Sequence, residues 1–245
     1  MADANESGVV RRGSPLISRL ADSIVPLLPS RVANLLQTRL VDWDNYYRGA
    51  EGQLGEQWNE IIWPAIKDFD FSTTLELSPG AGRNTERLSQ LASRLIVVDY
   101  NQDPLNRTRA RLGTRQGNCE ISYHKNNGSD LPMVPDESVT AVYCWDAAVH
   151  FDKHVAVSYI GEFARALEPG GSGFLHHSTL GDRAHKNIKQ NPDARSNVSK
   201  ELVAEACKAN GLTVTVQQAV PWKWSMDPRL SRETVDCVTV FRKDA

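Results

Sequence analysis

The sequence predicts an α/β fold in which helices cover both faces of a mostly parallel sheet. Short apolar runs alternate with segments of helical character over most of the chain after residue 56. A tight turn, Pro79–Gly82, directly follows the first of these runs, and an acid, Asp99, ends the second run. A strand, a glycine turn, a helix and a second strand ending in an acid form the first half of a nucleotide-binding α/β unit.

Length and composition indicate one large soluble domain with an extension. The chain has 245 residues, of which 40% are hydrophobic and 24% charged, and its net charge of −2 gives no broad basic field for nucleic acid. The four cysteines lack CxxC spacing, which argues against structural zinc and a disulfide framework. The sequence shows neither the apolar core of a signal peptide nor a run near the roughly 20 residues of a membrane span. We therefore expect a cytoplasmic protein without nucleic-acid or membrane partners.

The N-terminal part predicts an extension outside the sheet. Residues 1–13 are polar and are expected to be disordered, whereas residues 15–40 carry an irregular helical pattern that two prolines interrupt. Such short helices suit a cap over the active site, a homodimer contact or a membrane-surface helix, of which the last is disfavoured because the arginines form no dense polar face. We expect residues 1–55 to form the tail, cap and lid, and residues 56–245 to form the core domain.

Aromatic residues next to glycines predict a lid. Trp43, Tyr46 and Tyr47 precede three glycines within residues 49–55, a composition that suits a mobile segment closing over a flat or apolar ligand. Plain packing of these rings onto the domain explains the pattern equally well. A helix is expected to begin at Gln57 and to lead into the first strand.

The remaining elements follow from periodicity and turn residues. Long polar or proline-containing segments are expected at residues 181–197 and 221–234. The expected strands are residues 74–77, 95–99, 121–124, 139–145, 173–177, 213–220 and 235–242, and the expected helices are residues 85–93, 104–112, 156–167 and 199–210.

The first glycine turn lacks the third glycine of the dinucleotide fingerprint, because Gly82 leads into Arg83. Glu76 lies four residues before Gly80, where a carboxylate suits a cationic amino acid end better than a pyrophosphate. In this pattern the chain resembles the class I S-adenosylmethionine-dependent methyltransferases, whose motif I is roughly hydrophobic-E-x-G-x-G-x-G. Ser78 stands where that motif has its first glycine.

Two further features carry the resemblance, which covers residues 56–243. Asp99 matches the motif II acid at the end of the second strand, and Glu168–Gly171 resembles the L-x-P-G-G turn before the fifth strand. The resemblance implies a Rossmann-like, seven-stranded, mostly parallel sheet with an antiparallel last strand, and S-adenosylmethionine as cofactor.

The resemblance also implies which residues bind that cofactor. The two glycines of the turn would lie against its amino acid end and Asp99 on its ribose, and Asn127, with Asp130 as second choice, stands where the family binds the adenine amino group. An ordinary polar turn is the alternative explanation for residues 125–132. The expected cofactor-binding residues are Glu76, Ser78, Gly80, Gly82, Arg83, Asp99, Tyr100, Asn127, Gly128 and Trp145.

Histidines at the ends of the fourth and fifth strands are the candidate catalytic bases. Methyl transfer to a hydroxyl needs a group that takes its proton, and the pKa of histidine suits that task. His150 follows Asp146 at the i, i+4 spacing of a helical turn, which would let the carboxylate orient the imidazole. Of His176 and His177, only one is expected to face the site, because strand side chains alternate. Each histidine is about equally well explained as a hydrogen-bonded structural residue.

A metal site is the other interpretation of these strand ends. Asp146 and His177 stand where divalent-metal-dependent methyltransferases of this fold place ligands, and this resemblance would imply a magnesium ion as a second cofactor. Magnesium prefers oxygen ligands, and the sequence offers no clear second carboxylate there, which disfavours a metal.

Taken together, the glycine turn, the segment Asp146–His150 and the histidines at the end of the fifth strand resemble those of bacterial small-molecule O-methyltransferases, including those that act on sugars. The resemblance implies methyl transfer from S-adenosylmethionine to a hydroxyl of a small polar acceptor, with His150, His177 and Asp146 as catalytic residues and His176 with the lid aromatics at the substrate. N-methylation of a heterocycle, a non-catalytic S-adenosylmethionine-binding protein and an NAD-dependent oxidoreductase remain as alternatives.

Overall fold

The structure is a computed structural model that describes residues 43–184, 195–220 and 235–244. The predicted disordered tail and helical cap, most of the polar segment 181–197 and the segment 221–234 lie outside the described residues, and so does the predicted homodimer contact.

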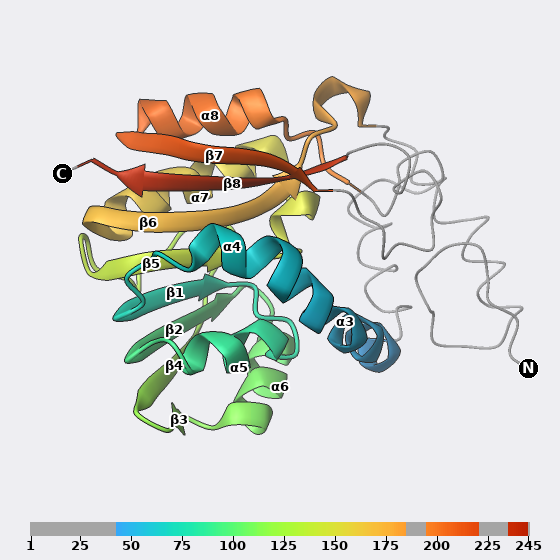
Figure 1. The fold of residues 1–245 in the computed structure, drawn as a ribbon, viewed down its shortest axis with the longest axis vertical. Helices are drawn as coiled ribbons and strands as arrows, with labels where there is room; N and C mark the ends of the chain where they lie inside the picture. The colour runs from blue at the N-terminus through green and yellow to red at the C-terminus, as the bar shows by residue number, and fades with distance from the viewer. Residues whose placement is uncertain (1–42, 185–194, 221–234, 245) are drawn as a thin grey trace, which may run out of the picture.

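The described part contains one sheet of eight strands in the order β3-β4-β2-β1-β5-β6-β8-β7 (Figure 1). The five central strands are parallel, and β8 runs antiparallel to both of its neighbours. The seven expected strands and the antiparallel last strand are confirmed, and β3 adds a two-residue edge strand. The strands are β1 (Thr73–Leu77), β2 (Arg94–Asp99), β3 (Arg115–Gln116), β4 (Cys119–Lys125), β5 (Val139–Cys144), β6 (Leu167–Ser178), β7 (Leu212–Val220) and β8 (Asp236–Lys243).

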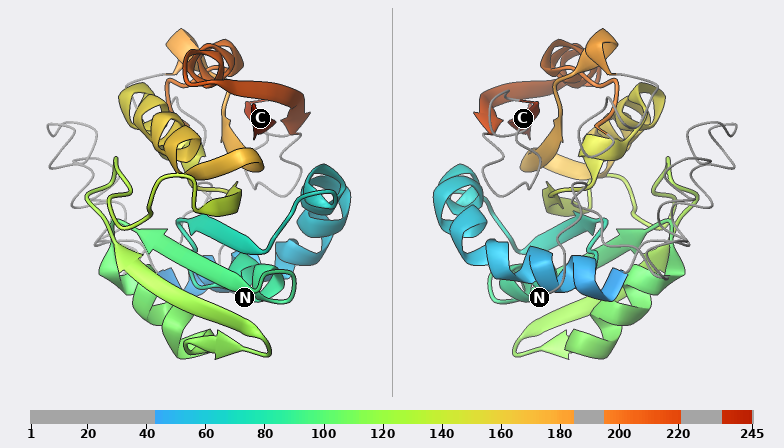
Figure 2. Two further views of the ribbon diagram at one scale, coloured as in Figure 1. Left: turned by 90° about the vertical axis from the view of Figure 1, so that its left-hand side faces the viewer. Right: turned by 90° about the vertical axis from the view of Figure 1, so that its right-hand side faces the viewer.

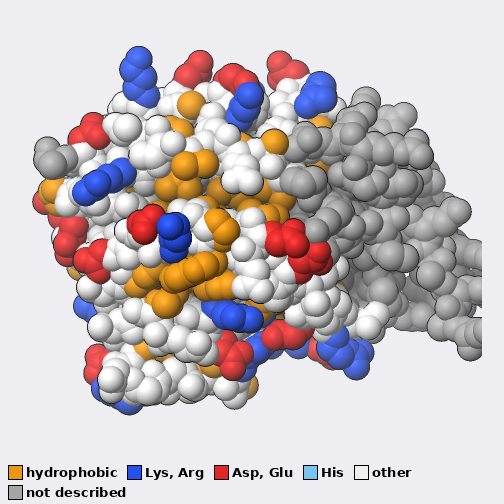
Figure 3. All heavy atoms as spheres, viewed as in Figure 1, with side chains coloured by type: hydrophobic (Ala, Val, Ile, Leu, Met, Phe, Trp, Pro, Cys, Tyr) orange, Lys and Arg blue, Asp and Glu red, His pale blue; other side chains and the backbone are white. Residues whose placement is uncertain are grey.

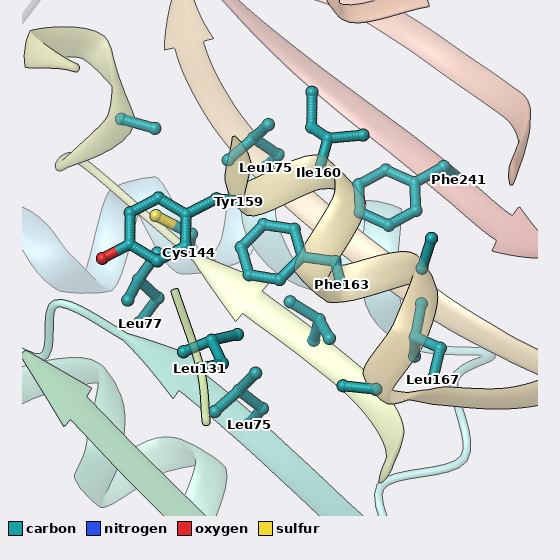
Figure 4. Packing of buried hydrophobic residues seen from close by; sticks show 14 of the residues in the cluster. Leu75, Leu77, Leu131, Cys144, Tyr159, Ile160, Phe163, Leu167, Leu175 and Phe241 are labelled. Carbon is teal, nitrogen blue, oxygen red and sulfur yellow. The ribbon is translucent and has the colours of Figure 1, made fainter. Parts of the chain in front are cut away.

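Helices cover both faces of the sheet, as predicted, and each face has its own apolar core (Figure 2). On one face the apolar side chains of α4 (Trp63–Ile66), α5 (Arg83–Ser89) and α6 (Gln102–Leu112) pack onto the strands. On the other face α7 (Lys153–Ala166) and α8 (Lys200–Ala209) do so. The second core is centred on fully buried rings such as Phe163 and Phe241 (Figure 4).

Side-chain caps decide where two of the helices begin. The Asp152 carboxylate accepts a hydrogen bond from the backbone N–H of His154 at 3.0 Å, so α7 starts three residues before the expected position. Ser199 caps α8 as predicted, since its hydroxyl accepts from the N–H of Leu202 at 3.2 Å. Gly211, with φ of +71°, follows the end of α8.

The helix before the first strand begins earlier than expected. Helix α3 (Trp43–Gln57) continues through a π-helical turn, η2 (Trp58–Ile62), into α4, so the segment predicted as a mobile lid is helical. The glycines suggested a break because each costs about 0.5–1 kcal/mol in a helix. Burial of Leu54 and Trp58 later in the same helix outweighs that cost. The domain boundary predicted at residue 55 therefore falls inside a continuous helix.

None of the described helices combines the length and the apolar composition that a membrane span requires.

Candidate cofactor and catalytic site

The candidate site lies at the edge of the sheet where the parallel strands end. Parallel strands place their carboxyl ends at the same edge, and open α/β sheets bind ligands there. Register pairs Glu76 in β1 with Val97 in β2 and with Tyr143 in β5. The turn after β1, Asp99 at the end of β2 and Asp146 after β5 are therefore neighbours.

The turn after β1 is held in a left-handed backbone. Ser78, Gly80 and Gly82 have φ values of 62°, 61° and 85°. Ser78 itself adopts the left-handed conformation at the position where the family motif has a glycine. Its backbone N–H donates a hydrogen bond to the Val98 carbonyl at 2.8 Å. A Cβ on Gly82 would lie 3.0 Å from Cγ2 of Thr108, so helix α6 packs closely against this turn. The turn is therefore built without the usual first glycine.

Asp99 lies beside that turn at the end of β2 and is 4% exposed. Burial raises the pKa of Asp99 to about 6, although hydrogen bonds from the backbone N–H groups of Asn101 and Tyr100 counter the rise. Tyr100 is 58% exposed, and a Cβ on Gly128 would lie 3.5 Å from Cβ of Tyr100. The structure thus brings the predicted ribose acid together with Tyr100 and Gly128.

Asn127 uses its side chain within its own turn. Its Oδ1 accepts from the N–H groups of Ser129 at 2.8 Å and Asp130 at 3.1 Å, and its Nδ2 donates to the Asp130 carboxylate at 2.6 Å. These are the contacts of an ordinary polar turn. The adenine contact of Asn127 stays a prediction.

Glu76 is a buried acid behind the turn. Its side chain is 2% exposed, and its Oε2 has no hydrogen-bond partner among the described residues. Burial raises the pKa of Glu76 to about 8, an effect that the neighbouring Thr85 side chain partly offsets. A cationic group that reached Oε2 would find an acceptor that has no hydrogen-bond donor among the described residues.

Asp146 follows β5 in a left-handed conformation, with φ of 57°. Its backbone N–H donates to Nδ1 of His176 at 3.2 Å, and its carboxylate pairs with Arg83 at 3.0 Å. Both side chains of this ion pair are 11% exposed, so water screens it little. Arg83 also donates to the Ala50 carbonyl at 2.6 Å, which ties the turn after β1 to β5 and to α3.

His176 belongs to a buried polar network that also includes Asp236 and Arg195. Because its Nδ1 accepts from Asp146, Nε2 carries the proton and lies 3.6 Å from the Asp236 carboxylate. Arg195 holds Asp236 with two hydrogen bonds of 2.9 and 2.7 Å. Burial raises the pKa of Asp236, but the contacts of its carboxylate with His176 and with the Arg195 guanidinium outweigh burial and lower the pKa. His176 therefore orients the backbone at Asp146 and has no free lone pair for a proton.

His177 faces the opposite side of β6. Its Nε2 lies 2.8 Å from the Thr239 hydroxyl and its Nδ1 lies 2.7 Å from the Ser178 carbonyl. Burial lowers the pKa of His177 to about 4. Register turns the His177 ring toward β8 and the α7 face, which argues against the predicted base role of His177 and against a metal shared with Asp146, an interpretation that the sequence already disfavours. Within the described residues no three His, Cys, Asp or Glu side chains gather as a metal site would require.

His150 ends a short 3₁₀ turn, η3 (Ala148–His150), and is exposed. The expected i, i+4 pairing with Asp146 is wrong, because the left-handed backbone of Asp146 precedes the turn and its carboxylate pairs with Arg83. The role of His150 as base stays a prediction.

Trp145 is a core residue next to the site. Its ring stacks on His176 with centroids 4.2 Å apart, and its Nε1 donates to Oε1 of Gln57 at 3.3 Å. Gln57 also accepts from Arg83 at 3.3 Å, so it links α3, β5 and the turn after β1. The sequence did not single out Gln57, because a polar residue at a helix boundary carries no signal of burial.

Two tyrosines of α3, Tyr46 and Tyr47, lie near the candidate site. A Cβ on Gly80 would lie 3.2 Å from the Tyr47 ring. Burial and then the charge of Asp99 raise the pKa of Tyr47, and the charge of Asp146 and burial raise the pKa of Tyr46. The predicted lid residues Tyr46 and Tyr47 thus lie near the two acids, whereas the side chain of Trp43 lies outside the description.

Comparison with known proteins gives one family match and many structural matches. Residues 74–171 match the family described as "Methyltransferase domain". The search of curated proteins gave no match.

Three solved structures represent the structural likeness. A geranyl diphosphate C-methyltransferase from Streptomyces coelicolor A3(2), solved with Mg²⁺, geranyl diphosphate and S-adenosyl-L-homocysteine, has a TM-score of 0.62 at 14% identity, covering 78% of each chain. The N-methyltransferase NodS from Bradyrhizobium japonicum WM9, solved with S-adenosyl-L-homocysteine, has a TM-score of 0.59 at 16% identity, covering 78% of this chain and 87% of that one. The [4+2]-cyclase SpnF has a TM-score of 0.61 at 13% identity, covering 79% and 83%.

At such identities the likeness shows a shared fold. The family match runs from β1 through α7 and ends within β6, before His176. Residues 74–171 are thus similar to the methyltransferase-domain family in sequence, and the described chain shares the fold of these solved structures.

Proposed function

We propose that the protein transfers a methyl group from S-adenosylmethionine to a hydroxyl of a small polar acceptor, such as a sugar or another natural product. The observation that carries the proposal is the left-handed turn Ser78–Gly82 with Glu76 behind it and Asp99 beside it. Glu76 would accept the cofactor's ammonium group, the backbone of the turn would approach its amino acid end, and Asp99 would accept from its ribose hydroxyls.

The acceptor side of the site would lie at the ends of β5 and β6. The sulfonium carries the methyl group, so this chain's residues need to align a nucleophile with it and, for a hydroxyl, take a proton. The Arg83–Asp146 ion pair fixes the end of β5, and the exposed imidazole of His150 follows it by one turn. We assign the base role to His150 because it is exposed at this edge, whereas His176 and His177 are fully buried.

The same observation supports a second candidate, N-methylation of a small heterocycle. An amine acceptor needs less help from a base than a hydroxyl does. Two of the histidines predicted at this edge, His176 and His177, are engaged in buried hydrogen bonds, so base assistance for a hydroxyl acceptor has less support here.

The test has two arms. In the first, the melting temperature of the protein is measured alone, with S-adenosylhomocysteine and with NAD, because a ligand of the folded state raises it. S-adenosylhomocysteine should raise it and NAD should not. In the second, radiolabelled S-adenosylmethionine is offered with sugars, other hydroxyl acceptors and heterocyclic amines. Label in an amine product alone would favour the second candidate, and label in none of the acceptors together with no melting shift would contradict both.

A further inference from the structure

Three buried oxygen atoms next to the glycine turn have no hydrogen-bond partner among the described residues. They are Oε2 of Glu76 in β1, Oγ1 of Thr85 in α5 and the hydroxyl oxygen of Tyr143 in β5. All three residues are at most 2% exposed. A buried polar group without a partner costs free energy, so these three atoms need an explanation.

The three side chains lie on the same face of the sheet. Register pairs Glu76 with Tyr143 in the neighbouring parallel strand, and the preceding residues, Leu75 and Val142, point into the other apolar core. Burial raises the pKa of Glu76, and the Thr85 side chain, which reaches the carboxyl from α5, partly offsets this rise. Two hydroxyl groups therefore flank one buried carboxyl.

Ring packing does not account for the hydroxyl of Tyr143. The ring stacks on Phe174 with centroids 5.2 Å apart, a contact that a phenylalanine would make equally well. Burial and then the charge of Glu76 raise the pKa of Tyr143, so the phenol keeps its proton and can donate a hydrogen bond. An ionised Glu76 carboxylate would be an acceptor for it.

The cluster lies beneath a charged surface. Acidic and basic side chains lie next to each other in the region of α3, α5 and α6 (Figure 3). Inside the protein, the charge of Glu76 also acts on two other titratable groups, Tyr123 in β4 and Cys144 in β5. The charges of Arg83 and Asp146 reach the cluster too, but these two side chains pair with each other at 3.0 Å. An ionised Glu76 would therefore depend on the hydroxyl groups beside it.

We propose that Tyr143 and Thr85 are positioning residues of the cofactor site, whose hydroxyls donate hydrogen bonds to the Glu76 carboxylate in the cofactor complex. In the free protein at pH 7 this carboxyl holds a proton. The cofactor's ammonium group would bind the ionised form, and the proton would pass to solvent. A carboxylate has about four acceptor positions, enough for the ammonium group and both hydroxyls. This inference rests on the proposed function, since it assigns Glu76 to S-adenosylmethionine.

Calorimetry of S-adenosylhomocysteine with the full chain at pH 6, 7, 8 and 9 tests the proposal. Tyr143→Phe should weaken binding by about tenfold at pH 7, as expected for one lost hydrogen bond to a charged group. At pH 9 the loss should fall to about twofold, because the carboxyl is then largely ionised before binding and the hydroxyl serves the free and bound protein alike. Thr85→Val should show the same pattern.

Two controls separate this role from a structural one. Tyr123→Phe removes a hydroxyl from the same face of the sheet, but one that already donates to the Gly113 carbonyl at 2.7 Å. This variant should change the affinity by less than twofold at every pH. In a Glu76→Gln background, Tyr143→Phe should also cost less than twofold, because the amide does not ionise.

Three results would overturn the role of the two hydroxyls while cofactor binding stands. They are unchanged affinity of Tyr143→Phe and Thr85→Val at pH 7, an equal loss at every pH, and an equal loss in the Glu76→Gln background. If the wild type binds no S-adenosylhomocysteine, the proposed function fails and this inference with it.

Discussion

Replacing Glu76 by glutamine should stabilise the free protein and weaken its cofactor binding at the same time. The buried carboxyl of Glu76 lacks a partner for Oε2, and burial raises its pKa from the ordinary 4.5 to about 8. A protonated carboxyl and an amide have nearly the same shape, so Glu76→Gln removes the titration with little change in packing.

The magnitude follows from linkage between protonation and folding. Between pH 4.5 and 8 the folded state holds a proton on Glu76 that the unfolded state has released, so stability falls as pH rises through this range. The penalty is absent below the unfolded pKa and complete above the folded one. At pH 7 it amounts to about 3 kcal/mol, and at pH 5 to about 1 kcal/mol or less.

Urea unfolding of wild type and Glu76→Gln at pH 5, 6, 7 and 8 measures this difference. The variant should be more stable by up to about 3 kcal/mol at pH 7, which corresponds to a melting temperature higher by about 6–12 °C for a domain of this size. The advantage should shrink toward pH 5.

The same substitution should lower cofactor affinity while it raises stability. Losing the carboxylate should weaken S-adenosylhomocysteine binding by about 1.5–3 kcal/mol, as for a hydrogen bond to a charged group. In the wild type at pH 7, binding should release close to one proton, which calorimetry in buffers of different ionisation enthalpy detects. A variant that is less stable than the wild type at pH 7, or that binds with unchanged affinity, would refute this reasoning.

Substitutions at three further positions test the site. His150→Ala should lower turnover on a hydroxyl acceptor by about 10²–10⁴-fold and leave S-adenosylhomocysteine affinity unchanged; near-normal turnover would remove the base role. Arg195→Gln leaves the Asp236 carboxylate buried without its cation and should lower the free energy of unfolding in urea by about 3–5 kcal/mol. A loss below about 1 kcal/mol would show that water reaches the Asp236 carboxylate. His176→Asn, whose Oδ1 can take the place of Nδ1 as acceptor for Asp146, should keep more S-adenosylhomocysteine affinity than His176→Gln, and equal losses would argue against the positioning role.

The fold was predictable because its signals are local. Apolar runs, the glycine turn Pro79–Gly82 and the acid after the second strand define the order of elements, and each reflects a backbone or burial requirement within a few residues. The continuous helix at the start of the described chain was missed, since its glycines signal a break and only the tertiary burial of Leu54 and Trp58 overrides them.

The positions of the acids at this edge of the sheet were more predictable than those of the histidines. The spacing of Glu76 and Asp99 from the glycine turn predicts where these acids lie. The surroundings of His176 and His177 depend on which face of β6 each side chain occupies, and strand register decides this. Asp236 and Arg195 are 41 residues apart in the chain, and no sequence pattern announces that pair. The left-handed backbone of Asp146 likewise follows from contacts with His176 and Arg83 that form only in the folded protein.

The most direct test of the central assignment is calorimetry of S-adenosylhomocysteine with the wild type and with Asp99→Ala. The account predicts that the wild type binds, and that removing the acid beside the turn weakens binding by about 1.5–3 kcal/mol, or roughly 10- to 150-fold. Equal affinity of the two proteins would contradict it, and so would a wild type that binds NAD in preference to S-adenosylhomocysteine.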